Sequence, residues 1–311
     1  MKRRDLLKTV GALGVASLVS DHSASAAEKL WKTAVGLNGF VSGESRYKRK
    51  YPIWEILHFA SEAGFDGVEL VEQWHWSGYP TVAETERINA LRRMYDAYGL
   101  QIFSIQLSVG QAFAPEAKLR GEWLETFTEQ VKFAAAVGCV HVGMWPGGGL
   151  RGQTMEQAIT NLGHSFHAAA DIAGEHGIIP CFEIEPPFVF NTEEHMQRIL
   201  AAADHPNLKV IYDPSHFDLM NGSTGKPHEM LQRIGLDRLG YLHFIDTDGT
   251  LRDGGTSKHL PCGEGHADLE QSLLVLKEGG FQGWIMIDEW EVPDPYHACI
   301  SCKELIERVQ G

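Results

Sequence analysis

Positive charge is scarce in this chain of 311 residues. Its 27 lysines and arginines stand against 41 aspartates and glutamates, which gives a formal net charge of −14. Proteins that bind the phosphate backbone of a nucleic acid usually carry a basic face, because neutralising the phosphates supplies most of their affinity. The balance therefore argues against nucleic acid and against an anionic membrane surface as partners. It favours a small-molecule substrate, and it leaves the oligomeric state open, a homo-oligomer included.

Long apolar runs are also missing after the N-terminal region, where no stretch is long and apolar enough to span a bilayer. Cysteine is sparse, with five in the chain. We interpret Cys139, Cys181 and Cys262 as buried small hydrophobes, because they lie in or near apolar segments. Cys299 and Cys302 fall on a helical C-terminal run, where we expect two unpaired neighbours on one helix face. A redox or metal-binding pair and a disulfide between these two residues are the alternatives.

The first residues have the pattern of a targeting segment and not of a folded domain. A basic stretch with the pair Arg3-Arg4 precedes a weakly apolar stretch, residues 9–20, and the small residues Ala24-Ser25-Ala26. This order is typical of a secretory signal, and the arginine pair resembles a twin-arginine export signal. We predict a twin-arginine-type signal peptide over residues 1–27 and a periplasmic mature protein. A basic amphipathic N-terminal helix is the alternative.

One unit, a short apolar strand followed by a longer amphipathic helix, repeats along the rest of the chain. The eight predicted strands are Thr33–Leu37, Gly67–Val71, Gln101–Leu107, Cys139–Trp145, Ile179–Ile184, Lys209–Asp213, Leu239–Ile245 and Trp284–Asp288. Several predicted helices stop at a glycine just before the next strand, as at Gly64, Gly138 and Gly177. Eight such units predict an α/β fold, a single-domain (β/α)₈ TIM barrel over residues 28–311. An open doubly wound sheet is the alternative, but the glycine-rich phosphate turn typical of its first strand is absent.

Acidic and histidine side chains end several consecutive strands of this predicted barrel. In a barrel, functional side chains come from the carboxyl ends of the strands and from the loops that follow. The side chains at those ends are Glu69, Glu183, Glu185, Asp213, His216, His243, Asp246, Asp288 and Glu289. Singly, an Asp-Pro or Glu-Pro pair is explained as a turn and a histidine as a core residue. Together they are expected to enclose a cation, because charged groups are seldom buried without a partner.

These segments resemble the xylose-isomerase-like barrel superfamily of sugar isomerases and epimerases, which also contains the endonuclease IV type of DNA repair enzyme. The resemblance covers about residues 33–292, and its motifs are Phe182-Glu183, Asp213-Pro214-Ser215-His216, Gly240-Tyr241-Leu242-His243, Gly263-Glu264-Gly265-His266 and Ile287-Asp288-Glu289. In the keto-sugar epimerases of that superfamily, a Glu, an Asp, a His and a second Glu hold one metal. The resemblance therefore implies the metal ligands Glu183, Asp213, His243 and Glu289. It also implies that Glu183 and Glu289 are the catalytic acid–base pair.

The resemblance extends to substrate contacts. The family's histidine three residues after the metal-binding Asp contacts substrate, and it matches His216. The other candidates lie at strand ends or in the following loops, and they are Glu185, Lys258, His259, Trp145, Trp74 and His75. Ser257 stands where the multi-zinc phosphodiesterases of the superfamily carry an Asp, which argues against an endonuclease IV-like function. A sugar-binding barrel without catalysis is the alternative outside enzymes.

Three oxygen ligands and one imidazole suit Mn²⁺, Mg²⁺, Co²⁺ and Zn²⁺. Among these ions we expect Mn²⁺ to be the bound metal. A divalent ion of this kind would polarise a carbonyl and acidify the neighbouring C–H, which favours an enediolate. One carboxylate would remove the proton and the other would return it, which predicts a sugar isomerase or epimerase. The same groups would also allow loss of a β-leaving group. A lyase or dehydratase acting on a keto-sugar, keto-glycoside or cyclitol therefore stays open.

Overall fold

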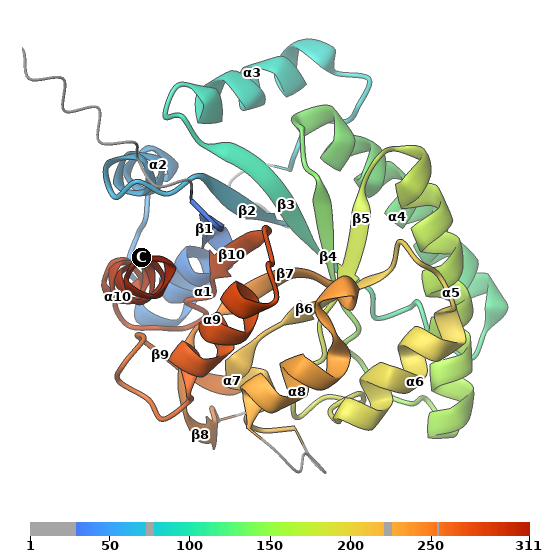
Figure 1. Cartoon of the computed structure of the whole chain (residues 1–311). Coiled ribbons are helices and arrows are strands. Elements are labelled where there is room, and N and C mark those ends of the chain that lie inside the picture. The colour runs from blue at the N-terminus through green and yellow to red at the C-terminus, as the bar shows by residue number, and fades with distance from the viewer. Residues whose placement is uncertain (1–28, 73–77, 221–225, 254) are drawn as a thin grey trace, which may run out of the picture.

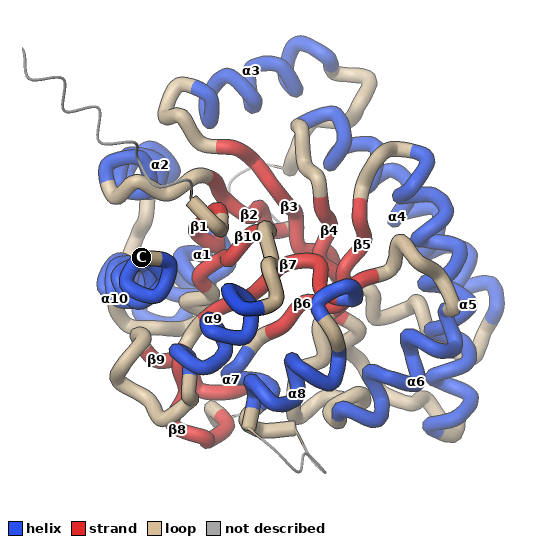
Figure 2. Tube along the Cα trace, viewed as in Figure 1, coloured by secondary structure: helices blue, strands red, loops and turns tan. Residues whose placement is uncertain are grey.

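The structure is a computed structural model that describes residues 29–72, 78–220, 226–253 and 255–311. Eight parallel strands close into a barrel, in the order β1-β10-β7-β6-β5-β4-β3-β2 around the ring. They are β1 (Lys32–Gly36), β2 (Gly67–Val71), β3 (Gln101–Ser108), β4 (His141–Trp145), β5 (Ile179–Phe182), β6 (Lys209–Tyr212), β7 (Leu239–Phe244) and β10 (Trp284–Ile287). Figures 1 and 2 show the strands in the middle and the helices around them, so the predicted TIM barrel is confirmed.

The helices form the outer layer of the barrel. They are α1 (Leu37–Tyr47), α2 (Ile53–Glu62), α3 (Thr85–Asp96), α4 (Ala117–Val137), α5 (Met155–Glu175), α6 (Glu193–Ala203), α7 (Pro214–Phe217), α8 (Pro227–Ile234), α9 (Leu269–Glu278) and α10 (Pro295–Gln310). Local signals in the sequence set their ends. Thr154 and Gln157 form a capping box at the start of α5, and α4 ends at Gly138 with φ 96°. No helix in the described part of the chain is long and apolar enough to cross a membrane.

The inside of the barrel has a small core of its own, separate from the larger core between strands and helices. Its buried side chains all come from strands, and they are Ala34, Phe103, Cys181, Ile211, Tyr241, Trp284 and Met286. The rings of Phe103 and Trp284 stack with their centroids 4.5 Å apart. These side chains fill the interior, so the barrel is packed and not an open pore.

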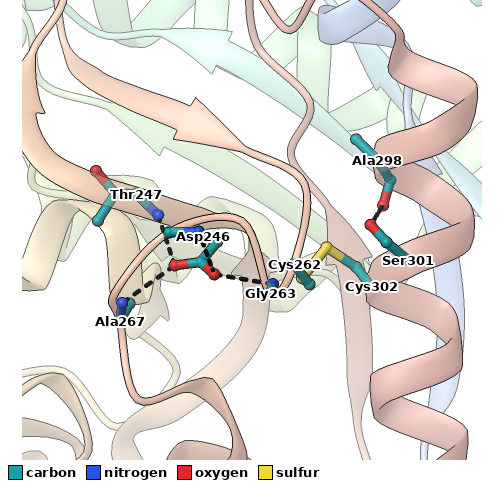
Figure 3. Close-up of a disulfide and its surroundings, with 9 residues drawn as sticks. Asp246, Thr247, Cys262, Gly263, Ala267, Ala298, Ser301 and Cys302 are labelled. Carbon is teal, nitrogen blue, oxygen red and sulfur yellow. Dashed lines mark hydrogen bonds between the residues drawn. A yellow bond between two sulfur atoms is a disulfide. The ribbon is translucent and has the colours of Figure 1, made fainter.

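A two-stranded antiparallel hairpin, which the sequence did not predict, follows β7 outside the ring. It consists of β8 (Asp246–Leu251) and β9 (Ser257–Leu260). The Asp246 carboxylate accepts hydrogen bonds from the backbone N–H groups of Gly263 at 2.9 Å and Ala267 at 3.1 Å (Figure 3). It also accepts one from the backbone N–H group of Gly265 at 3.1 Å. One buried carboxylate thus holds the loop after β9 against the start of β8.

A disulfide fixes the same loop to the last helix. Cys262 pairs with Cys302 of α10, with their Cα atoms 4.8 Å apart (Figure 3). The prediction that Cys262 is a buried hydrophobe without a partner is wrong, and so is the prediction that Cys302 is unpaired. Cys299, one turn earlier in α10, is a free buried thiol, so the alternative disulfide between Cys299 and Cys302 is also wrong. The pairing joins residues 40 positions apart, and spacing along the chain does not reveal it.

Candidate metal centre

The polar side chains of the centre lie directly above the core inside the barrel. Side chains alternate between the two faces of a strand, so a residue two positions after an inward-facing one also points inward. Cys181, Ile211, Tyr241 and Met286 belong to the inner core. Two positions further along each strand come Glu183, Asp213, His243 and Asp288. The two-residue alternation of side chains along each strand thus directs these four side chains into the barrel interior, at its carboxyl end.

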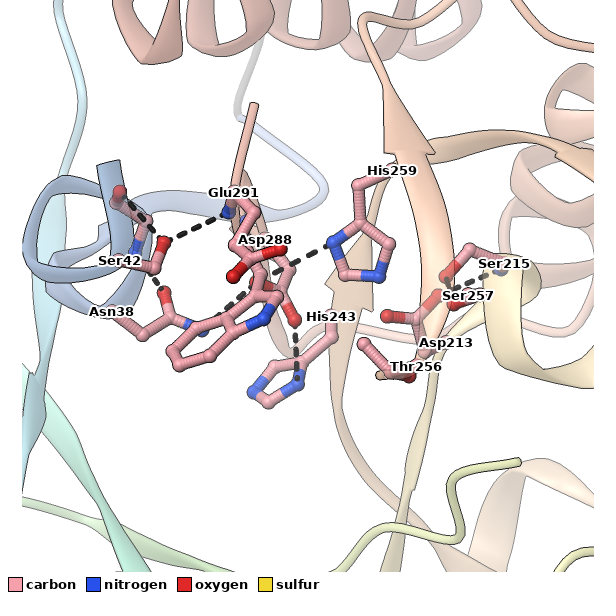
Figure 4. Close-up of polar contacts among 12 residues, drawn as sticks. Asn38, Ser42, Asp213, Ser215, His243, Thr256, Ser257, His259, Asp288 and Glu291 are labelled. Carbon is pink, nitrogen blue, oxygen red and sulfur yellow. Dashed lines mark hydrogen bonds and ion pairs between the residues drawn. The ribbon is translucent and has the colours of Figure 1, made fainter. Parts of the chain in front are cut away.

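These four side chains form a compact and buried group. One ligand atom from each of Glu183, Asp213, His243 and Asp288 lies within 4.8 Å of the others. The Nδ1 atom of His243 is 2.8 Å from Glu183 Oε1. The same atom is 3.6 Å from Asp288 Oδ2 (Figure 4). The structure therefore brings together three of the four predicted ligands and adds Asp288 as the fourth member.

Asp213 is held by the turn that its Asp-Pro pair begins. Its Oδ1 atom accepts a hydrogen bond of 2.7 Å from the Ser215 backbone N–H at the start of α7, where Pro214 occupies the first helical position. Its Oδ2 atom is buried and has no hydrogen-bond partner among the described residues. The cap fixes one oxygen and leaves the other directed at the group.

His243 is oriented from behind by Glu69 of β2. Its Nε2 atom donates to Glu69 Oε1 at 3.0 Å, and the Tyr241 hydroxyl donates to Glu69 Oε2 at 2.6 Å. A carboxylate that accepts from the far nitrogen of a metal-binding histidine is a common way to fix the ring and the tautomer. The sequence already contained the signal, an acid in the middle of an apolar strand, but it did not reveal this partner.

Glu289 lies outside the group, although it follows Asp288 directly. An odd step along the strand turns its side chain away from the barrel interior and toward the helices. A Cβ at Gly39 of α1 would come within 2.3 Å of Glu289 Cγ, so the carboxyl group is pressed against that helix. Asp288 instead accepts a hydrogen bond of 2.8 Å from Asn38 Nδ2. The predicted ligand Glu289 is thus not brought to the other three.

Two buried histidines stand on the other side of the group. His216 Nε2 is 3.8 Å from both Glu183 Oε1 and Asp213 Oδ2, and His216 Nδ1 is hydrogen-bonded to Ser257 Oγ at 2.6 Å. His259 Nδ1 is 3.9 Å from Asp288 Oδ1 (Figure 4). Asp213, His216, His259 and Asp288 make a second set of atoms within 4.8 Å of one another, which shares its two aspartates with the first.

A cavity of about 610 Å³ opens above the metal centre. Among the predicted substrate contacts, Trp145, Glu185, His216 and His259 line it. Lys258 is not among the lining residues, and it pairs with Asp248. The alternation of β9 explains this, because Ser257 and His259 face inward and Lys258 faces outward. The predicted contacts Trp74 and His75 lie outside the described residues.

The cost of burying these groups shows in their pKa values. Burial raises the pKa of Glu183, and burial together with the Glu183 charge raises the pKa of Asp213 well above its usual range. Burial lowers the pKa of His216 well below its usual range, so this imidazole is neutral. Three buried carboxylates around one imidazole, one of them with a free oxygen, form a set of donors that fits a divalent cation.

Comparison with known proteins places the chain in a family. The family described as Xylose isomerase-like TIM barrel matches residues 57–302. The chain belongs to this family. Inosose dehydratase of Geobacillus kaustophilus (strain HTA426) is 25% identical over 248 residues, which cover 71% of this chain and 78% of that protein. The putative hydroxypyruvate isomerase of Mus musculus is 23% identical over 252 residues, which cover 74% and 81%.

A solved structure shares the fold. The crystal structure of IOLI protein with a binding zinc atom has a TM-score of 0.70 at 18% identity, covering 90% of this chain and 98% of that one. The two relatives are named as a dehydratase and an isomerase, so the family context is enzymatic.

Proposed function

We propose that this protein is a divalent-metal-dependent isomerase or epimerase, which removes a proton beside a carbonyl group of a small sugar-like polyol. The observation that carries the proposal is the buried Asp213 Oδ2 atom, which has no hydrogen-bond partner among the described residues and belongs to a group of three carboxylates and one imidazole. A buried carboxylate oxygen without a partner is costly, and a cation would remove that cost.

In this proposal Glu183, Asp213, His243 and Asp288 hold one divalent ion, and Mn²⁺ is our choice because carboxylate-rich sites suit it. The bound ion would act as a Lewis acid toward a carbonyl and a neighbouring hydroxyl of the substrate. Glu69 supports the site by keeping His243 in one orientation.

The proton transfers fall to the carboxylates that reach the cavity. Glu183 and Asp288 line the cavity, whereas Asp213 and His243 do not. We assign removal of the α-proton to one of these two carboxylates and its return to the other. Return to the opposite face of the same carbon is epimerisation, and return to the former carbonyl carbon is isomerisation. Positioned acids and bases of this kind contribute typically about 10²–10⁴-fold to a rate.

A dehydratase is the second candidate, and the similarity to inosose dehydratase favours it. The first step, removal of the proton, is the same. A hydroxyl group on the next carbon would then leave as water, after taking a proton from a neighbouring acid. The carboxyl group that has just taken the α-proton can supply this proton, and the imidazoles of His216 and His259, which line the cavity, are placed to hydrogen-bond the hydroxyl group.

We also propose that the protein is exported through the signal predicted over residues 1–27. This stretch lies outside the described residues, and the proposal is based on the order of its basic, apolar and small-residue segments. Fractionation of the source cells and mass spectrometry of the mature chain test it. A mature N-terminus near Ala27 supports export, and a cytoplasmic chain that retains Met1 would disprove it.

Proton NMR in D₂O tests the proposed chemistry. The metal-loaded enzyme is incubated with inosose, D-fructose, D-ribulose and hydroxypyruvate, and the α-proton signal of each is followed. We expect the signal of at least one substrate to disappear with the wild-type enzyme and to persist with Glu183→Gln, while His216→Ala mainly raises KM. A new isomer identifies the isomerase or epimerase, and loss of water identifies the dehydratase. Exchange that survives Glu183→Gln would contradict the proposal.

A further inference from the structure

The wall of the cavity carries one sign of charge. Its lining residues include the acidic side chains Glu72, Glu183, Glu185, Asp253, Asp288 and Glu291, and they include no lysine or arginine. The undescribed internal segments, residues 73–77, 221–225 and 254, contain no lysine or arginine in the sequence either. One divalent ion would leave the site negative, because three acidic side chains surround it.

The cations near the cavity are already engaged with carboxylates. Arg46 Nη1 lies 2.9 Å from Glu291 Oε2, and Arg252 Nε lies 3.3 Å from the same oxygen. Lys258 pairs with Asp248. Among the described residues no ion pair involves Glu72 or Asp253. A phosphate or carboxylate group on a substrate would therefore meet carboxylates at the wall and no unpaired lysine or arginine side chain.

The remaining wall suits a neutral ring with hydroxyl groups. Trp145 and Phe188 pack edge to face with their centroids 4.8 Å apart, and Val41, Val71 and Leu107 extend this apolar surface. The lining also includes polar side chains such as Thr256 and His259, which can hydrogen-bond hydroxyl groups. Both ring nitrogens of the buried His259 lack a hydrogen-bond partner among the described residues. Pockets of this kind combine an apolar lining with a few polar groups that orient the ligand.

We infer that the cavity selects uncharged polyhydroxy carbonyl compounds and rejects phosphorylated or carboxylated ones. The inference rests on the proposed function and names its substrate class. The selection is electrostatic, because the half-buried Glu72 and the exposed Asp253 both line the cavity and repel a negatively charged substrate. Unpaired charge also contributes, because in the proposed reaction the metal binds the carbonyl and its neighbouring hydroxyl, and an additional buried anionic group would find no lysine or arginine in the lining as its partner.

Matched pairs of compounds test the inference. D-Fructose is compared with D-fructose 6-phosphate and with D-fructuronate, and D-ribulose with D-ribulose 5-phosphate. Binding to the metal-loaded protein is measured by quenching of tryptophan fluorescence, and α-proton exchange is measured in parallel. We expect the uncharged member of each pair to bind at least about tenfold more tightly. The repulsion between one negative charge on the substrate and one carboxylate at about 6 Å, in a dielectric between those of water and the protein interior, is of this size. Raising the salt concentration should reduce the difference in affinity between the charged and the uncharged member of each pair.

A charge reversal sharpens the test. Asp253→Lys places a cation at the cavity wall and should raise the ratio of anionic to uncharged affinity by about tenfold or more. The control is Glu125→Lys, which makes the same change in net charge on the exposed face of α4, and it should leave the ratio unchanged.

The outcomes separate the two proposals. Equal or tighter binding of the anionic members, or an unchanged ratio in Asp253→Lys, would overturn the inference even if exchange occurs. Selective binding of the uncharged members without any exchange would support the inference and count against the proposed chemistry.

Discussion

Asp288 and Glu289 are neighbouring acids with opposite surroundings. The Asp288 side chain faces the barrel interior, where Asn38 donates to it and His243 lies 3.6 Å away. The Glu289 carboxyl is buried against α1, and burial together with the Asp288 charge raises its pKa well above the usual range. The family resemblance implied Glu289 as the ligand. The alternation of side chains along β10 favours Asp288, because Trp284 and Met286 already point inward.

Substitution of each acid by its amide tests this assignment. We expect Asp288→Asn to lower metal affinity by at least about 10–100-fold. Substitution of a residue that only hydrogen-bonds a metal ligand already causes a loss of this size, and Asp288 is proposed as a ligand itself. Glu289→Gln should keep its metal, since the amide fills the same space outside the centre. Metal content after dialysis, measured by elemental analysis, reports the result. Loss of metal in Glu289→Gln, with retention in Asp288→Asn, would reverse the assignment.

Glu69 makes a separate prediction at the same scale. Glu69→Gln removes the charge that orients His243 and should weaken metal binding by about 10–100-fold without unfolding the protein. Glu72→Gln is the matched control, because Glu72 follows the same strand and does not contact His243. Titration of metal into both metal-free variants gives the affinities. Equal affinities for the two variants would show that Glu69 has no supporting role.

At the scale of elements, the sequence predicted the barrel strands because each is a short apolar run followed by a helix-stop or loop signal. The predicted Gly67–Val71 matches β2, and the other strands differ by one or two residues at their ends. The β8–β9 hairpin was not predicted, because its residues are polar and lie outside the repeated unit of an apolar strand and an amphipathic helix. Its position depends on Asp246 and on a disulfide, which are contacts between distant segments.

The disulfide should be a major source of stability. Closing a loop of 40 residues contributes about 4 kcal/mol in the chain-entropy description. We expect the double variant Cys262→Ser/Cys302→Ser to lose a free energy of unfolding of this order, measured by urea denaturation under non-reducing conditions. A reducing agent should lower the stability of the wild type and leave the double variant unchanged. A similar loss in both proteins would mean that the reductant acts elsewhere.

At the scale of the whole molecule, the metal centre links stability to pH. Burial raises the pKa of Glu183 and Asp213 above their ordinary values of 4.5 and 3.8 in the metal-free protein. Above those ordinary values the native state holds protons that the unfolded chain has released. The contribution of these two carboxyl groups to the free energy of unfolding of the metal-free protein therefore falls as pH rises from about 4 toward neutrality. A bound metal replaces these protons and removes the loss.

The prediction is that metal removal lowers the melting temperature more at pH 8 than at pH 5.5. Calorimetry of dialysed metal-free protein and of metal-loaded protein at both values measures the two differences. The loaded form gains because metal binds the native state and not the unfolded chain. A difference that is equal at both pH values, or larger at pH 5.5, would contradict the linkage.

The whole molecule also shows why prediction from sequence was more complete for the fold than for the site. The repeat of strands and helices determines the barrel, and the barrel determines which strand ends meet. Acids and histidines at these strand ends could therefore be listed from the sequence, and the family resemblance implied Glu183, Asp213 and His243, which the structure brings together. The choice between Asp288 and Glu289, and the support from Glu69, depend on the direction of individual side chains across the ring.

Anomalous diffraction from crystals soaked in Mn²⁺ tests the metal centre directly. We predict one strong peak within bonding distance, about 2.0–2.6 Å, of oxygens of Glu183, Asp213 and Asp288 and of a nitrogen of His243. The peak should vanish in crystals of Asp288→Asn. A peak beside Glu289, a peak held by His216 and His259 without Glu183 and His243, or no peak at all would contradict the assignment.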